Sequence, residues 1–286
     1  MRFESIRRQV ASRADAVRLA CEWEVCAPKL GNVHHRARFA DCDHSDFLRA
    51  AGAIAPVLGS DDRALTLGDR ILLAVKATRE VTLSNVNLGI ILLIAPLAMA
   101  DDPGAVRRGI ESLTLDDGQK VFAAIRLASP GGMKREDVAP EQDVQAESAR
   151  PVDLLAAMKQ AASRDRIALQ YATAFSDFFT RVVPLVKAEL DQPHDVESSI
   201  VNAQIRLMAE DVDSLIARKC GDEIAQEARR RAIDCWHDNS AAARERLDRW
   251  LRADGNRRNP GTTADLIAAS LYWLLRPAST EVAHHG

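Results

Sequence analysis

The amino-acid sequence predicts an all-α protein, and three observations support this fold class. Apolar residues make up 47% of the 286 positions, which is enough to bury a sizeable core. Most segments between polar turns place their apolar residues three and four positions apart, as an amphipathic helix does. No segment shows the period of two that is typical of a strand, and no Asn-Gly hairpin turn separates apolar runs. We therefore expect a multi-helix bundle, with one domain over residues 1–276.

The first half of the chain predicts six helices. Residues 4–26 contain no helix breaker and predict one long helix, which Pro28 ends. Residues 43–58 carry an apolar stripe, and Thr66 with Asp69 forms a capping box that opens a helix through Arg79. The longest apolar run, 88–100, is shorter than the roughly 20 residues of a membrane span, so it predicts a buried helix. Two further helices are expected to begin at 102–103 and at 114–117, the second ending at residue 128.

The second half begins with the one long loop. Residues 129–150 are charged and contain Gly and Pro, and we interpret them as a candidate lid or as a solvated connection. Residues 152–189 predict helical structure that is bent or broken at Pro184. The remaining expected helices are 196–209, 212–219, 222–237, 241–251 and an apolar helix after the turn at 259–265. The tail, 277–286, has few means of ordering itself and is expected to be disordered.

Charge and cysteine content exclude several classes of protein. A net charge of −3 without a long basic run argues against a dedicated nucleic-acid binder. The N-terminus is polar and lacks an apolar signal core. Five cysteines without a Cys-x-x-Cys pair indicate reduced thiols in a cytoplasmic protein rather than disulfides or structural zinc. We expect neither nucleic acid nor a membrane as a partner, and the sequence leaves a homo-oligomer open.

Loop-to-helix junctions carry the candidate binding residues. Three of them, 28–34, 84–89 and 259–263, combine Asn and Gly with a cation or a hydroxyl. Helix ends gather on one of the two ends of a bundle, so these junctions predict one polar pocket for phosphates and ribose hydroxyls. The expected substrate-binding residues at these junctions are Lys29, Asn32, His34, Asn85, Asn87, Asn259, Thr262 and Thr263.

The turn at 259–265 has two interpretations. Thr262 and Asp265 match a capping box, and on this segment alone a well-capped core helix is the favoured one. A helix start is also an anion site, because its unpaired amides and its dipole face outward. Arg218 and Lys219 also have two possible roles. Their charges either compensate the helix dipole at a C-terminus before Gly221, or they bind substrate.

A group of metal-capable side chains lies between residues 34 and 46. Its spacing fits no zinc pattern, and Asp43 is equally suited to cap the next helix. We expect Mg²⁺ carried by a nucleotide triphosphate instead, with Asp41 or Asp46 as its candidate protein ligand. The sequence contains no phosphate-binding P-loop, no dinucleotide fingerprint and no nucleophile elbow.

Four blocks of the sequence resemble the triphosphoribosyl-dephospho-coenzyme A synthase family. They are Pro28-Lys29-Leu30-Gly31-Asn32-Val33-His34, Asn85-Val86-Asn87-Leu88-Gly89, Asp213-Ser214-Leu215-Ile216-Ala217-Arg218-Lys219 and Pro260-Gly261-Thr262-Thr263-Ala264-Asp265-Leu266. The resemblance runs from about residue 20 to residue 275. It implies an all-α fold and a transfer reaction in which ATP loses adenine. The triphosphoribosyl group passes to the 2′-hydroxyl of dephospho-coenzyme A.

The implied reaction assigns chemical roles to residues of these blocks. Transfer of a sugar passes through an oxocarbenium-like state, which needs a carboxylate nearby. Asp265, Asp41 and Asp46 are the expected catalytic carboxylates. The expected cations for the triphosphate are Lys29, Arg218 and Lys219.

The chain also departs from the family pattern. Leu30 stands where the family usually has a second Pro, and Val86-Asn87-Leu88 stands where decarboxylase-associated members tend to carry Thr-His-Lys. Two alternative hypotheses therefore accompany the implied transfer to dephospho-coenzyme A. One is a paralogous enzyme that uses ATP with a different acceptor in one-carbon cofactor biosynthesis. The other is a non-catalytic helical protein that binds a nucleotide or a partner.

Overall fold

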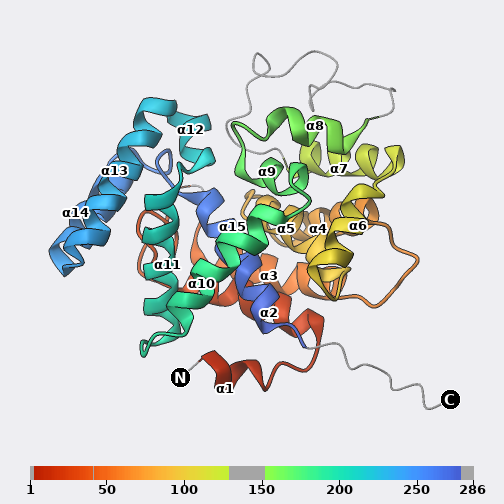
Figure 1. Cartoon of the computed structure of the whole chain (residues 1–286), viewed down its shortest axis with the longest axis horizontal. Helices are drawn as coiled ribbons and strands as arrows, with labels where there is room; N and C mark the ends of the chain where they lie inside the picture. The colour runs from red at the N-terminus through yellow and green to blue at the C-terminus, as the bar shows by residue number, and fades with distance from the viewer. Residues whose placement is uncertain (1–2, 41, 129–151, 278–286) are drawn as a thin grey trace.

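The computed structural model describes residues 3–40, 42–128 and 152–277, and over these residues the chain is all-α (Figure 1). The predicted fold class is therefore confirmed. The described helices are α1 (Phe3–Arg7), α2 (Arg13–Cys26), α3 (His44–Leu58), α4 (Leu67–Val81), α5 (Leu88–Ala98), α6 (Pro103–Glu111), α7 (Leu115–Ala128), α8 (Leu154–Ala161), α9 (Arg166–Ala172), the π-helical turn η2 (Phe178–Val182), α10 (Val183–Leu190), α11 (Val196–Glu210), α12 (Ser214–Cys220), α13 (Asp222–Asp238), α14 (Ala241–Arg252) and α15 (Gly261–Leu275). The expected lid (129–150) lies outside the described residues, as does the expected disordered tail beyond residue 277.

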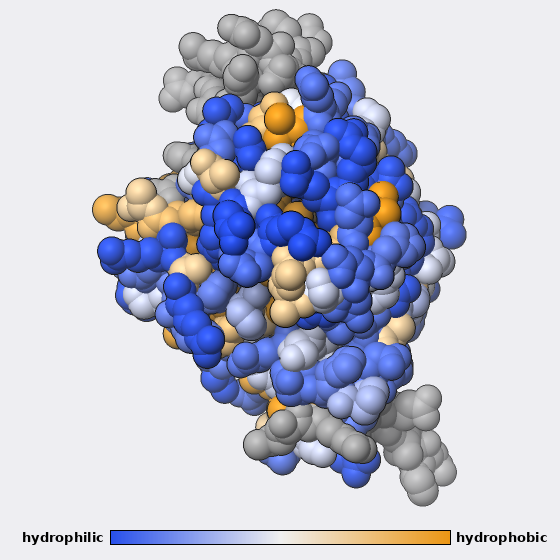
Figure 2. All heavy atoms as spheres, turned by 90° about the vertical axis from the view of Figure 1, so that its left-hand side faces the viewer, coloured by the Kyte–Doolittle hydropathy of each residue, from blue (hydrophilic) through white to orange (hydrophobic). Residues whose placement is uncertain are grey.

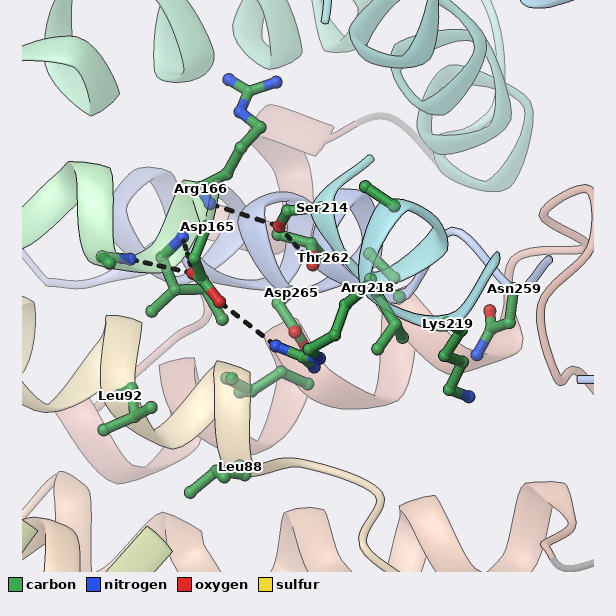
Figure 3. A pocket seen from close by; sticks show the side chains of 18 of the residues that line it. Leu88, Leu92, Asp165, Arg166, Ser214, Arg218, Lys219, Asn259, Thr262 and Asp265 are labelled. Carbon is green, nitrogen blue, oxygen red and sulfur yellow. Dashed lines mark hydrogen bonds and ion pairs between the residues drawn. The ribbon is translucent and has the colours of Figure 1, made fainter. Parts of the chain in front are cut away.

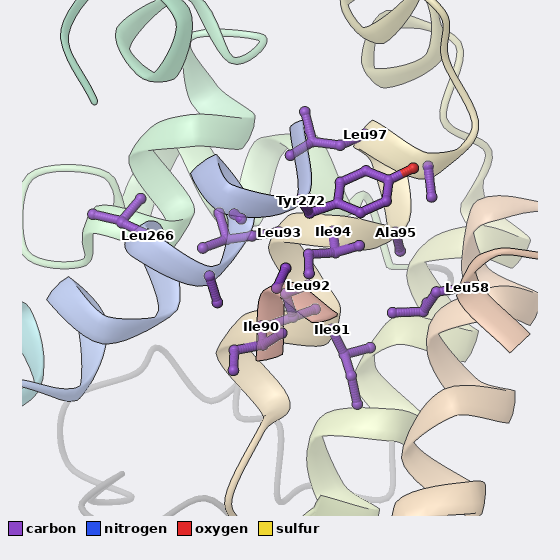
Figure 4. Packing of buried hydrophobic residues seen from close by; sticks show 14 of the residues in the cluster. Leu58, Ile90, Ile91, Leu92, Leu93, Ile94, Ala95, Leu97, Leu266 and Tyr272 are labelled. Carbon is purple, nitrogen blue, oxygen red and sulfur yellow. The ribbon is translucent and has the colours of Figure 1, made fainter. Parts of the chain in front are cut away.

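Helix α5 is the centre of the main hydrophobic core. Its residues are buried on all sides from Ile90 to Ala98, which is the pattern of a helix enclosed by others. Leu266 and Tyr272 of α15 pack beside it, and Leu58 of α3 reaches it from another side (Figure 4). The core thus fixes the starts of α5 and α15 relative to each other. In the described part of the chain no single helix is long and apolar enough to cross a membrane, and only α5 with α6, bent by 108°, meets both criteria as a pair.

A second, smaller hydrophobic cluster joins α11, α13 and α14. Ile205, Ala228 and Leu247 are buried in it together with Leu30, which the chain supplies from the loop after α2. The opposite side of α11 packs into the main core, so this helix connects the two clusters. The outer face of this part of the molecule is mostly hydrophilic (Figure 2).

The single helix expected over residues 4–26 is wrong. The structure has two helices, because α1 ends at Arg7 and α2 begins at Arg13. Ser12 adopts extended backbone angles, and its Oγ accepts a hydrogen bond from the amide of Asp15 at 3.0 Å. The Ser-x-x-Asp pattern at this position is an N-cap signal that the periodicity of the apolar residues obscured.

The break expected at Pro184 is also misplaced. Pro184 lies in the first turn of α10, directly after η2, and the helical path continues through it. The chain breaks instead before Asp165, whose side chain caps α9, and again at Ala174 and Phe175. The last two residues have φ angles of 47° and 63°, which side chains other than Gly rarely adopt. Tertiary packing rather than a local breaker ends the helix there.

Candidate active site

A cavity of about 1520 Å³ lies where α2, α5, α9, α12 and α15 meet. It exceeds the roughly 300–1,000 Å³ of a typical small-molecule site, so it has room for more than one ligand group. The three junctions that the sequence singled out all reach its wall. The expected site residues that line it are Asn32, Asn85, Asn87, Arg218, Lys219, Asn259, Thr262 and Asp265.

The first and last junctions are joined directly. Asn32 Nδ2 donates a hydrogen bond to Asn259 Oδ1, although the two residues are far apart in the sequence. Gln204 of α11 holds the same loop: its Nε2 donates to Asn32 Oδ1 at 2.8 Å and to the Leu30 carbonyl at 2.7 Å. Its Oε1 accepts from the Leu30 amide at 2.8 Å. Gln204 is completely buried, and a lone polar residue inside an apolar helix face is the signal that could have identified it.

Gly31 lets this loop approach α14. Its φ of 71° favours glycine, and a Cβ there would lie 2.7 Å from Leu251 Cβ. The Gly31 amide donates to Asp248 Oδ1 at 2.8 Å, and Arg252 donates to the Asn32 carbonyl at 2.8 Å. The loop is therefore positioned by residues that lie about two hundred positions further along the chain.

The capping box expected at Thr262 and Asp265 is wrong. Neither side chain caps α15; the cap comes from Asp213, which precedes α12. Asp213 Oδ2 accepts from the amide of Thr263 at 2.8 Å and from its hydroxyl at 2.7 Å. Its Oδ1 caps α12 through the amides of Leu215 and Ile216. The Thr263 hydroxyl is therefore bonded to Asp213, and Thr263 does not line the cavity. Asp265 has no capping role.

Asp265 lies at the cavity wall against Gly89. A Cβ on Gly89 would come within 2.0 Å of Asp265 Oδ2, so only glycine admits the carboxyl group there. Among the described residues Asp265 forms no hydrogen bond and no ion pair. Burial raises the pKa of Asp265 well above its ordinary value of 3.8, and the negative charges of Glu24 and Asp213 raise it further. Asp265 therefore holds its proton more tightly than an exposed aspartate does.

Basic side chains line the cavity near Asp265 (Figure 3). Arg218 Nη1 lies 3.2 Å from Asp165 Oδ2, and its guanidinium extends beside Asp265 (Figure 3). Arg166 Nη1 lies 3.0 Å from Asp211 Oδ2, and Arg229 also lines the wall. Sequence analysis missed Arg166 and Arg229, because they lie outside the junction motifs. Cations gathered on one wall suit a polyphosphate.

Lys29 is placed differently from the expectation. It does not line the cavity; its ammonium group is completely buried and lies 2.8 Å from Glu24 Oε1. Lys29 Nζ also donates to the backbone carbonyl of Glu24. Its placement does not support a direct contact with phosphate. Glu24, which the sequence gave no reason to select, lines the cavity instead.

Asp46, one of the two residues expected near a metal, does not line the cavity. Asp46 completes the capping box of α3, and its Oδ1 accepts from Arg49 at 2.6 Å and from Thr82 at 3.0 Å. Its position therefore does not support the expected catalytic role. His34 also lies off the cavity wall, and burial lowers its pKa to about 4.

Asp41 lies outside the described residues. Within residues 3–40, 42–128 and 152–277 no group of three His, Cys, Asp or Glu side chains is arranged to hold a metal ion. Both carboxylate oxygens of Asp46 accept hydrogen bonds, from the Asp43 amide and from Arg49. Mg²⁺ bound through the phosphates of ATP remains a prediction.

Comparisons with known proteins agree with this architecture. The family model described as ATP:dephospho-CoA triphosphoribosyl transferase (CitG) matches residues 10–281. A crystal structure from Archaeoglobus fulgidus, of a protein proposed to be a triphosphoribosyl-dephospho-CoA synthase, has the same fold with a TM-score of 0.60 and 24% sequence identity. That likeness covers 81% of this chain and 97% of the other. No curated protein matches the chain. The family match spans nearly the whole sequence and includes every element that forms the cavity, so the chain belongs to the ATP:dephospho-CoA triphosphoribosyl transferase family of enzymes.

Proposed function

We propose that the protein transfers the triphosphoribosyl group of ATP to a hydroxyl group of dephospho-CoA and releases adenine. The observation that carries this proposal is Asp265, a carboxyl group without a bonding partner that lines the same cavity as several cations, with the Arg218 guanidinium beside it (Figure 3). Such a site offers a proton to a leaving base and positive charge to a polyphosphate, which are the two demands of this transfer.

Asp265 acts as the general acid in this proposal. As the bond between C1′ of the ribose and the adenine nitrogen breaks, its electron pair goes to adenine, which takes a proton from Asp265. The acceptor oxygen forms the new bond to C1′, and its hydroxyl proton passes to solvent, which then reprotonates Asp265. The raised pKa of Asp265 favours this role over the expected one, in which an ionised Asp265 supports the sugar cation.

The triphosphate is assigned to the basic wall. Arg166, Arg218 and Lys219 line the cavity on the α9 and α12 side. Helix α5 also begins at the cavity, and its N-cap residue Asn87 makes no side-chain cap, so the amides of its first turn are free of a competing side-chain acceptor. Asn259 and Thr262 offer hydrogen-bonding groups for the ribose.

The test is incubation with ATP and Mg²⁺, with and without dephospho-CoA, followed by mass spectrometry of free adenine and of the adduct. We expect adenine release that depends on the acceptor. Asp265→Asn should lower turnover by roughly a hundredfold or more, the scale of losing a general acid. Asp195→Asn is the matched control, because Asp195 is an exposed N-cap of α11 and does not line the cavity.

Three results would contradict different parts of the proposal. Full turnover by the Asp265→Asn variant would remove Asp265 from the chemistry. Tight binding of ATP without adenine release would favour the non-catalytic alternative. Adenine release with one-carbon cofactor precursors, but not with dephospho-CoA, would keep the transfer reaction and change the acceptor.

A further inference from the structure

A buried ion pair stands at the cavity wall beside Asp265. Glu24 lies near the C-terminal end of α2, and Lys29 lies in the loop that follows; their side chains are 5% and 0% exposed. Lys29 Nζ also donates to the Glu24 carbonyl, which satisfies a free backbone group at the helix end. Glu24 in turn neutralises the buried ammonium group. Because both groups lose their hydration, the pair adds little net stability to the fold, and its place at the cavity points to a further role.

The pair is oriented with the carboxylate toward the cavity. Glu24 lines the cavity, whereas Lys29 does not. A ligand therefore meets the negative charge first, and the positive charge lies behind it. Because Lys29 holds the carboxylate at 2.8 Å, its position is fixed before a ligand arrives. A fixed charge in a buried position acts more strongly than the same charge in water, and the Glu24 side chain is buried.

The two carboxyl groups of the wall have opposite surroundings. The charged groups that act on Asp265 are Glu24 on α2, Asp213 and Arg218 at α12, and Asp165 before α9. Arg218, the one cation among these four, forms its ion pair with Asp165 and not with Asp265. Glu24, in contrast, has an ammonium partner that is permanently in place. Carboxyl groups whose surroundings differ in this way take different roles in catalysis, one as an acid and one as a charge.

We propose that Glu24, positioned by Lys29, is the carboxylate that stabilises the positive charge on the ribosyl group as adenine leaves. This inference rests on the proposed transfer reaction and adds a second catalytic residue to it. Glu24 forms no bond with the sugar; its negative charge opposes the charge that develops on C1′ and the ring oxygen. Asp265 supplies the proton, and Glu24 supplies the electrostatic stabilisation.

The test measures steady-state adenine release by the Glu24→Gln variant. We expect turnover to fall by roughly a hundredfold or more, while the KM for ATP changes by less than about threefold, because the lost interaction exists only in the transition state. Glu189→Gln is the matched control, since Glu189 is also buried and paired, with Arg206 Nη1 at 2.7 Å, and does not line the cavity. Its turnover per folded molecule should be unchanged.

The pH dependence of turnover provides a second test, because it would not change if Glu24 had only a structural role. Turnover should decline as pH rises through the pKa of Asp265, since the acid must be protonated. Glu24 raises this pKa, so its removal should shift the decline to lower pH. The Glu189→Gln control should leave the profile in place.

Folding is tested separately, because Glu24→Gln leaves the Lys29 charge buried. The double variant Glu24→Gln/Lys29→Met removes both charges and should fold, yet remain as slow as the single variant. Turnover by the double variant within threefold of the wild type would overturn the inference alone. A wild-type protein that releases no adenine with any acceptor would overturn the proposed reaction, and this inference with it.

Discussion

The Asp265 carboxyl group should make the free energy of unfolding depend on pH. Its native pKa is raised above 3.8, so the folded state holds the proton more tightly than the unfolded state. The free energy of unfolding therefore falls as pH rises from 3.8 through the native pKa, by about 1.4 kcal/mol for each unit of the shift. The Asp265→Asn variant has no titratable group at this position, so its free energy of unfolding does not fall in this way. We expect the variant to melt at a higher temperature than the wild type at neutral pH, and at a similar temperature below pH 3.8.

Asp195→Asn should show the opposite sign in the same thermal melts. Hydrogen bonds from Ser198 lower the pKa of Asp195, so its carboxylate stabilises the fold above its unfolded pKa. The variant should be less stable than the wild type at neutral pH, and the difference should vanish as pH falls through the lowered native pKa. Identical pH dependence in the wild type and in Asp265→Asn would contradict a raised pKa for Asp265.

Gly89→Ala tests the placement of the same carboxyl group. The added Cβ would overlap Asp265 Oδ2, so the carboxyl group must move away from its position. We expect turnover to fall by roughly a hundredfold, the effect of a displaced catalytic group. Gly52→Ala in α3 is the control, because a Cβ there meets nothing within 4 Å. It should gain about 0.5–1 kcal/mol of stability and keep its activity.

Sequence analysis selected Asp265, and the structure places this residue in the cavity wall but not in the capping role that its pattern suggested. The pattern of Thr262 and Asp265 suggested a local cap, and the structure supplies that cap from Asp213, about fifty positions earlier. A local pattern cannot reveal that a more distant carboxylate occupies the same amides. Lys29 shows the same limit: a cation in a polar loop suggested a phosphate contact, and only the fold reveals Glu24 beside it.

At the scale of elements, α11 positions the loop at 30–32 through one side chain. Gln204→Leu would remove the hydrogen bonds to Leu30 and Asn32 and leave their buried polar groups without partners. We expect a loss of about 1–3 kcal/mol in stability and a higher KM for ATP, because Asn32 and Asn259 would no longer be held. Gln192 is exposed and its side chain makes one hydrogen bond, so Gln192→Leu should change neither the stability nor the KM for ATP. An unchanged KM in Gln204→Leu would show that this loop does not contact ATP.

Helices were predictable where their caps are local. The N-caps at Asp43, Thr66 and Asp102 follow the expected patterns, and the helices after them begin where the sequence indicates. The breaks at 162–165 and 173–175 were not predictable in this way. Neither contains Gly or Pro, and the left-handed backbone at Ala174 and Phe175 is maintained by packing of aromatic rings.

On the scale of the whole molecule, the cavity connects the main core to the second cluster. Its wall includes α5 and α15, which belong to the main core, and the α12–α13 region, which belongs to the second cluster. ATP bound there should slow hydrogen exchange on both sides, and at a hundredfold excess over Kd it should add about 2.7 kcal/mol of stability. AMP, which lacks the triphosphate, is the control. Protection limited to one cluster would contradict binding between them. The same measurement tests the predicted lid at 129–150.

The contacts of the loop at 30–32 also set the order in which the protein can be completed during its synthesis. The partners of that loop are Gln204, Asp248, Arg252 and Asn259, all of which leave the ribosome long after the loop itself. Contacts between such distant positions form slowly, because a large stretch of chain must first be brought together. A nascent chain that ends before residue 204 therefore lacks all of these side-chain partners of the loop. Competence to bind a nucleotide should appear only when translation is nearly finished.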